Sequence, residues 1–158
     1  MSDLSHVDEH GRARMVDVSD KPITARMARA TGSIRMQRET LEAIRANTIA
    51  KGDVLGTARV AGIMAAKRTS ELIPLCHPIA LTDVSVEIRL DDSLPGLRVE
   101  AAAKTAAQTG VEMEAIVAVS VSLITVYDMV KAVDKSTVIG EILLAEKVGG
   151  RSGHWQRS

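Results

Sequence analysis

Residues 81–104, LTDVSVEIRLDDSLPGLRVEAAAK, predict a β-hairpin, and this hairpin decides the class of fold. Within residues 81–90 apolar and polar side chains alternate from Val84 onward, and the alternation returns over residues 97–104. Such alternation is typical of a strand with one buried face and one wet face. Residues 91–96 contain Asp, Ser, Pro and Gly, which favour a turn. The sequence therefore predicts two neighbouring antiparallel strands.

Helices and two further strands are predicted on either side of the hairpin. Residues 111–133 are too long for one strand and predict a main helix that is largely buried. The full order is a strand (23–36), two helices (39–47, and 53–67 with Asp53 as N-cap), the hairpin, the main helix and a last strand (138–148). This order predicts an α+β fold, with a ferredoxin-like antiparallel sheet and helices packed on one face.

The length of 158 residues favours one compact domain, since domains of about 150 residues are common. We divide the chain into a polar N-terminal arm (1–20), a single α+β domain that holds the candidate catalytic residues (21–150) and a flexible C-terminal tail (151–158). The tail follows a glycine-rich segment.

Composition argues against several kinds of partner. The 20 basic and 20 acidic residues cancel, so no global field draws the chain to nucleic acid or to an anionic membrane. Tyr127 and Trp155 are the only aromatic residues, which leaves no platform for base stacking. The charge-free run 115–127 would span about 20 Å as a helix, too short for a bilayer. Residues 1–15 lack the apolar core of a secretory signal. We expect a cytoplasmic protein that binds neither nucleic acid nor membrane.

Lys51 and His77 are candidates for proton transfer or substrate binding. Lys51 precedes a helix N-terminus, where positive surroundings lower the pKa of an ammonium group, although a solvated lysine fits the pattern too. His77 lies in the segment 74–78, which its two prolines stiffen, and could orient a substrate or make a structural hydrogen bond.

The main helix carries charged residues at its two ends. Glu112 and Glu114 open it, where they could serve a site or only complement the helix dipole. Asp128 and Lys131 lie one turn apart near its end, as an acid/base pair or as a simple ion pair.

Basic residues cluster in ways that suit a phosphate. Seven of them fall between residues 12 and 38, and others form the pairs Lys67 with Arg68 and Lys147 with Arg151. No P-loop or dinucleotide-binding spacing occurs. Cys76 and its neighbour His77 are poorly placed to chelate one ion, so the sequence predicts no metal site.

Longer strings of the sequence carry a family resemblance. They are HVD (6–8), MVDVS (15–19), KGDV (51–54), AAKRT (65–69), LIPLCHP (72–78), TGVEMEA (109–115) and YDMVKA (127–132). With these strings the chain resembles the molybdenum cofactor biosynthesis protein C (MoaC) family, the cyclic pyranopterin monophosphate synthases. The resemblance extends from about Leu4 to Gly153.

The resemblance implies a lyase that converts (8S)-3′,8-cyclo-7,8-dihydroguanosine 5′-triphosphate to cyclic pyranopterin monophosphate and pyrophosphate. It implies a homohexamer, a trimer of dimers, whose substrate comes from a radical-SAM GTP cyclase. No protein-bound cofactor is expected, although the substrate triphosphate could carry Mg²⁺. The family's site positions map onto Lys51, Leu75, Cys76, His77, Glu112, Met113, Glu114, Asp128 and Lys131.

Within this set we assign Lys51 as general acid and Lys131 as general base, with Asp128 orienting Lys131; the two lysine roles could be reversed. Two lysines that share a pocket would depress each other's pKa. We expect His77 and Glu114 to hold the guanine-derived rings. Lys67, Arg68 and the arginines of residues 12–38 are candidate triphosphate contacts. A non-catalytic nucleotide-binding regulator and a structural assembly subunit are the alternative functions.

The length of the main helix constrains the site. Glu114 and Asp128 are fourteen residues apart, or roughly 21 Å along a continuous helix. One ligand could hardly contact both in one chain. We therefore expect a site shared between subunits, in which Lys51 and His77 of one chain face Asp128 and Lys131 of another.

Overall fold

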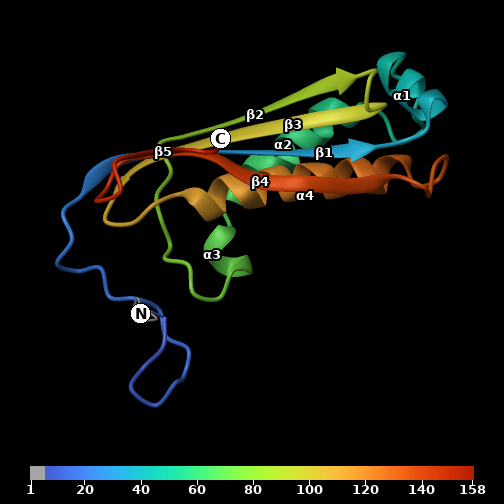
Figure 1. The fold of residues 1–158 in the computed structure, drawn as a ribbon. Helices are drawn as coiled ribbons and strands as arrows, with labels where there is room; N and C mark the ends of the chain where they lie inside the picture. Colours follow the sequence, from blue (N-terminus) through green and yellow to red (C-terminus); the bar gives the residue numbers. More distant parts are fainter. Residues whose placement is uncertain (1–5) are drawn as a thin grey trace.

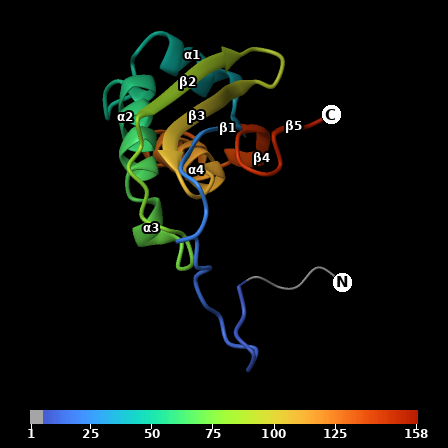
Figure 2. The same ribbon diagram turned by 90° about the vertical axis from the view of Figure 1, so that its left-hand side faces the viewer.

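One antiparallel sheet and four helices make up the part of the chain that the computed structural model describes, residues 6–158. In chain order the elements are β1 (Thr24–Arg35), α1 (Arg38–Arg45), α2 (Val54–Ala66), α3 (Thr69–Leu72), β2 (Asp83–Asp91), β3 (Gly96–Ala107), α4 (Glu112–Val130), β4 (Val138–Val148) and β5 (His154–Gln156). The strand order is β2-β3-β1-β4-β5. Helices α2 and α4 lie on one face of the sheet (Figure 1, Figure 2). The predicted α+β fold is confirmed.

The predicted elements lie close to their expected bounds. The hairpin of β2 and β3 pairs Asp83 with Lys104 at one end and Asp91 with Gly96 at the other. Strand β4 coincides with the predicted last strand, and α4 covers most of the predicted main helix.

Two elements were not predicted. Helix α3 is a single short turn between Arg68 and Ile73. Strand β5 pairs with β4, with Lys147 opposite Trp155, after the chain reverses at residues 149–153. The predicted tail, residues 151–158, therefore contains a short strand, which extends the sheet at residues 154–156.

Close packing of α2 against α4 fixes the helix layer. The Ser122 hydroxyl of α4 donates a hydrogen bond to the Ala58 carbonyl of α2 at 3.0 Å. Gly62, one turn further along α2, lies so close to α4 that an added Cβ would come within 2.9 Å of the Ala118 carbonyl oxygen. Ala58 and Ala66, four residues to either side of Gly62, are both buried.

Helix α4 forms the centre of the core and spans the length of the sheet. Within residues 6–158 it is the one helix long and apolar enough to cross a membrane. Over its most apolar stretch 56% of the residues are buried, as expected of a core helix. Because the helix is continuous from Glu112 to Val130, residues at its two ends lie far apart in the molecule.

The N-terminal arm, residues 6–20, extends away from the sheet (Figure 1). Its tip is organised by Asp8, whose carboxylate accepts hydrogen bonds from the backbone N–H groups of His10 and Arg12 at 2.9 Å. The arm rejoins the body at Val16, whose carbonyl contacts His77.

Candidate active site

Two lysines bracket one carboxylate at the C-terminal end of α4. The ammonium group of Lys51 lies 2.7 Å from Asp128 Oδ2, and that of Lys131 lies 2.7 Å from Asp128 Oδ1. Lys51 also donates to the backbone carbonyl of Asp128 at 2.8 Å. The three side chains, the lysine–aspartate cluster, are each about half exposed.

The loops at both sides of the cluster are fixed by local structure. Gly52 adopts φ 99°, which lets the chain turn sharply between Lys51 and α2. Asp53 then caps α2 by accepting a hydrogen bond from the N–H of Gly56 at 3.0 Å. Beyond the end of α4, buried Asp134 accepts a hydrogen bond from the N–H of Gln37 at 2.8 Å.

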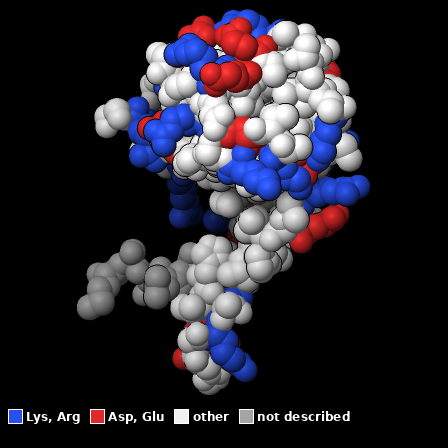
Figure 3. Space-filling view, turned by 90° about the vertical axis from the view of Figure 1, so that its right-hand side faces the viewer, with Lys and Arg blue, Asp and Glu red and all other residues white. Residues whose placement is uncertain are grey.

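The electrostatics of the cluster differ from the prediction. Hydrogen bonds from Lys131 and Lys51 lower the pKa of Asp128 to about 2. The same carboxylate raises the pKa of Lys131 through a hydrogen bond and its charge. The expected mutual lowering by the two lysines is therefore wrong for Lys131, because Asp128 lies between them. This end of the molecule mixes basic and acidic side chains on its surface (Figure 3).

A cavity of about 430 Å³ lies at the opposite, N-terminal end of α4. The predicted substrate-binding residues gather there: Leu75, Cys76, His77, Glu112, Met113 and Glu114 all line it. Its volume is within the range of small-molecule sites. Residues of the arm close one side, where a ring nitrogen of His77, Nε2, lies 2.6 Å from the Val16 carbonyl oxygen. This ring cavity is the chain's best candidate for holding the fused rings of a substrate.

Buried Glu114 and half-buried Cys76 are the titratable groups of the ring cavity whose pKa values are shifted. Glu114 is only 4% exposed, and burial together with the nearby Glu112 raises its pKa. Burial, with a further contribution from the charge of Glu114, raises the pKa of Cys76. Cys76 is thus held as a thiol, and Glu114 can keep a proton more readily than an exposed glutamate.

Glu112 has a cation of its own. Lys147 of β4 lies 3.0 Å from Glu112 Oε1, and both side chains are about two-thirds buried. The sequence placed Lys147 only among the basic residues that suit a phosphate. The ion pair instead ties β4 to the first turn of α4 and holds Glu112 at the edge of the ring cavity.

The structure keeps the lysine–aspartate cluster and the ring cavity apart. Fourteen residues of continuous α4 separate Glu114 from Asp128, or roughly 21 Å. Lys51 joins Asp128 within the same chain, so the prediction that these two residues face each other across subunits is wrong. His77 lies with the ring cavity at the N-terminal end of α4, at the opposite end from Lys51 and Asp128.

The predicted phosphate contacts are scattered. Lys67 ends α2 and lines a shallow groove that shares Ile79 with the ring cavity. Arg68 is exposed at the start of α3, and Arg29 is held by Glu100 and Glu146 on the other side of the sheet.

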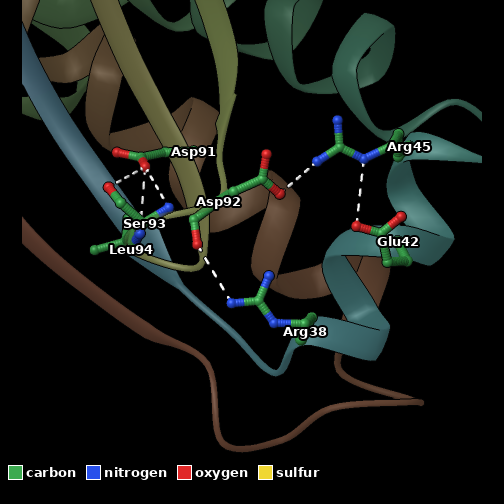
Figure 4. A network of polar contacts seen from close by, with 7 residues as sticks. All are labelled: Arg38, Glu42, Arg45, Asp91, Asp92, Ser93 and Leu94. Carbon is green, nitrogen blue, oxygen red and sulfur yellow. Dashed lines mark hydrogen bonds and ion pairs between the residues drawn. The ribbon is translucent and has the colours of Figure 1, made fainter.

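The far end of the sheet uses its basic residues for structure. Arg45 contacts the Asp92 carboxylate at 2.6 Å, and Arg38 donates to the Asp92 carbonyl (Figure 4). The Asp91 carboxylate accepts hydrogen bonds from Ser93 and Leu94 in the same turn (Figure 4). Arg38 is thus far from the ring cavity and committed to the β2–β3 turn.

Sequence reasoning missed the part that the arm plays in the site. Val16, Val18 and Lys21 line the ring cavity beside His77. The strings HVD at residues 6–8 and MVDVS at residues 15–19 were the available signals, since His6 lines the cavity too. No group of three or more His, Cys, Asp or Glu residues suited to a metal ion occurs within residues 6–158.

Comparisons with known proteins agree on one family. Residues 15–150 match the MoaC family. The chain is 58% identical to a protein of Cereibacter sphaeroides over 158 residues, which cover all of this chain and 99% of the relative. It is 57% identical to a protein of Thermomicrobium roseum, covering 99% and 95%, and 59% identical to one of Brucella ovis, covering 96% and 92%. Each of these relatives is named cyclic pyranopterin monophosphate synthase.

Proposed function

The chain belongs to the MoaC family, and we infer that it is a cyclic pyranopterin monophosphate synthase of molybdenum cofactor biosynthesis, a lyase. The reaction turns (8S)-3′,8-cyclo-7,8-dihydroguanosine 5′-triphosphate into cyclic pyranopterin monophosphate and pyrophosphate. The observation that carries this function is 57–59% identity over nearly the whole chain to relatives of that name.

The lysine–aspartate cluster supplies proton transfer. Opening a carbon–nitrogen bond and closing a phosphate ring both move protons, and a positioned acid or base typically contributes 10²–10⁴-fold. Lys51 is held by two oxygens of Asp128, whereas Lys131 is held by one. This difference favours Lys51 as the acid that stays in place and Lys131 as the base that leaves Asp128 to take a proton.

The ring cavity recognises the fused rings. His77 and Glu114 present polar atoms in a wall that also includes the apolar side chains of Leu75 and Met113. The carboxyl group of Glu114 can pair with the amine and amide hydrogens of a guanine-derived ring. Any Mg²⁺ that the reaction needs would enter on the substrate triphosphate.

A second copy of the chain would bring the two regions together. Helix α4 has no charged residue between Glu114 and Asp128, and exposed Val60, Met64 and Ile124 leave the outer surface of α2 and α4 apolar. A two-fold axis near the middle of α4 would place the ring cavity of one chain beside the lysine–aspartate cluster of the other. This arrangement supports the proposed homohexamer, a trimer of dimers.

The proposed setting is the cytoplasm, with the substrate supplied by a radical-SAM GTP cyclase. The test is to incubate the purified protein with the cyclised triphosphate and identify the recovered compounds by mass spectrometry. We expect cyclic pyranopterin monophosphate and pyrophosphate. Unchanged bound ligand would instead indicate a nucleotide-binding regulator, and no bound ligand would indicate a structural subunit.

A further inference from the structure

Within residues 6–158 two charged side chains are buried, Glu114 in the ring cavity and Asp134 in the segment after α4. The proposed reaction uses only the first. Asp134 is 2% exposed. Burial alone would raise its pKa, but hydrogen bonds from the backbone N–H of Gln37 and from Ser136 lower it below the ordinary value. Asp134 is therefore a buried anion, which is costly unless its oxygens are hydrogen-bonded.

Both carboxylate oxygens of Asp134 accept hydrogen bonds. Oδ2 accepts from the backbone N–H of Gln37 at 2.8 Å and from the Thr40 hydroxyl at 3.2 Å, at the start of α1. Oδ1 accepts from the N–H of Ser136 at 2.9 Å and from its hydroxyl at 2.6 Å. Gln37 is the N-cap of α1, and its own side chain makes no capping bond. Asp134 thus anchors the N-terminus of α1 from another part of the chain, where the helix dipole favours a negative charge.

A tight turn at the end of α4 connects Asp134 to Lys131. The N–H groups of Asp134 and Val133 both donate to the Val130 carbonyl at 2.9 Å. Lys131 is the C-cap of α4, and its N–H donates to the Tyr127 carbonyl at 2.9 Å. The backbone from Lys131 to Asp134 is thus one hydrogen-bonded turn, so a displacement of Asp134 would move Lys131 as well.

The other end of α1 leads to Lys51. The Thr48 N–H donates back to the Ala43 carbonyl of α1 at 2.9 Å, and the Gly52 N–H donates to the Ile49 carbonyl at 2.9 Å. The side chain of Ile49 is buried in the core. Because the connection from α1 is hydrogen-bonded and packed in this way, the position of Lys51 follows that of α1.

We propose that Asp134 is a positioning residue, which sets the relative position of the two lysines of the lysine–aspartate cluster by joining the start of α1 to the end of α4. The effect on catalysis rests on the proposed function, in which these lysines transfer protons. A misplacement of about 1 Å can cost about 10²-fold in rate. Asp134 therefore matters for kcat although it acts only through the two lysines.

Asp134→Asn tests this role with little change of shape. The amide keeps one oxygen, but its NH₂ group would face hydrogen-bond donors on the other side, so one of the two attachments is lost. We expect kcat to fall about 10–100-fold. KM should stay within about threefold of wild type, because the residues that line the ring cavity are untouched. A purely structural role would lower the melting temperature and leave kcat unchanged.

The matched control is Asp91→Asn in the β2–β3 turn (Figure 4). Asp91 forms the same kind of turn, accepting from the N–H of Ser93 at 2.9 Å and from its hydroxyl at 2.5 Å, and its other partners, Leu94 and Arg98, lie outside α1. This variant should keep kcat within about threefold of wild type. If Asp134→Asn fails to fold by circular dichroism, Thr40→Val takes its place in every measurement, since it removes one donor on the α1 side and keeps the carboxylate.

Crystal structures of the wild type and the variant supply a readout that needs no turnover. The ammonium groups of Lys51 and Lys131 each lie 2.7 Å from Asp128. At least one of these distances should lengthen beyond ion-pair contact in the variant. Unchanged distances, or a kcat within about threefold of wild type, would overturn the proposal. Longer distances in the variant of a protein that does not turn over the cyclised triphosphate would support the positioning role and count against the proposed function alone.

Discussion

Asp128 contacts both lysines around it and raises the pKa of Lys131. Its carboxylate, with a pKa of about 2, stays ionised at all physiological pH values and favours the charged form of Lys131. Lys131 can therefore act as a base only after it gives up a proton that Asp128 stabilises. The Asp128 side chain thus holds both lysines in position and raises the pKa of Lys131.

Lys51→Ala and Lys131→Ala should each lose about 10²–10⁴-fold in kcat, the usual contribution of a general acid or base. Both variants should stay folded, because the two lysine side chains are about half exposed. Steady-state kinetics and thermal melting measure the two effects. Turnover within a few-fold of the wild type in either variant would remove that lysine from the assignment.

Asp128→Asn should shift the pH dependence of the remaining activity. Because the carboxylate raises the pKa of Lys131, removing its charge lowers that pKa. If Lys131 is the base, the rise of kcat with pH should move to lower pH in the variant. An unchanged inflection would show that Lys131 does not titrate in the rate-limiting step.

Glu114→Gln should change both the pH dependence of stability and the binding of the substrate. The raised pKa of Glu114 means that its ionised form is disfavoured in the folded protein, so its contribution to stability is lost as pH rises through the folded pKa. The melting temperature of Glu114→Gln relative to wild type should therefore increase as pH rises above the ordinary pKa of a glutamate. Its KM should rise several-fold through the weakened hydrogen bonding to the ring. A KM equal to that of wild type would exclude Glu114 from ring binding.

At the scale of elements, the close contact between α2 and α4 can be tested directly by a substitution at Gly62. An added methyl at Gly62 would meet the Ser122 hydroxyl and the Ala118 backbone, and overpacking costs about 1–3 kcal/mol. Gly62→Ala should lower the melting temperature by several degrees. Gly140→Ala is the matched control, since nothing lies within 4 Å of a Cβ there. Equal melting temperatures for the two variants would contradict the close approach.

The sequence patterns predicted the elements that have a clear period. Alternation located β2 and β3, and the long apolar run located α4. Helix α3 is four residues long, too short to show a helical period. Strand β5 has three residues and forms only because β4 offers an unpaired edge after the glycine turn. The sequence suggested that Gly149, Gly150 and Gly153 make this segment flexible. In the structure their positive φ angles allow the tight turn between β4 and β5.

Residues of the site were easier to predict than their arrangement. Every predicted member of the ring cavity lies there, but the sequence could not show that Lys51 meets Asp128, 77 residues further on. That contact depends on how the loop before α2 folds against the end of α4. The pKa of Lys131 could not be predicted either, because it depends on Asp128 lying between the two lysines.

At the scale of the whole molecule, the apolar outer surface of α2 and α4 should be buried in an assembly. Exposed apolar residues at this surface, Val60, Met64 and Ile124, are 49–56% exposed in the single chain. Light scattering at micromolar protein should report a hexamer. Ile124→Lys should reduce the assembled fraction while leaving the fold intact. A wild type that remains monomeric would overturn the proposed assembly.

A shared site makes a specific demand on mixtures of two impaired variants, whose activity after mixing is compared with that of each variant alone. Glu114 and Asp128 lie at opposite ends of α4, so a two-fold pair of Glu114→Gln and Asp128→Asn chains contains one intact site and one doubly altered site. Random mixing makes half the pairs of this kind, so about a quarter of wild-type activity should return.

The control pair is Lys51→Ala with Asp128→Asn, whose altered residues lie in one cluster within each chain. Every site in that mixture carries one altered residue, so no activity should return. Activity measured after unfolding and refolding the mixed chains, with exchange confirmed by native mass spectrometry, distinguishes the two cases. Equal recovery in both mixtures, or none in either, would mean that the ring cavity and the lysine–aspartate cluster do not meet across a two-fold axis.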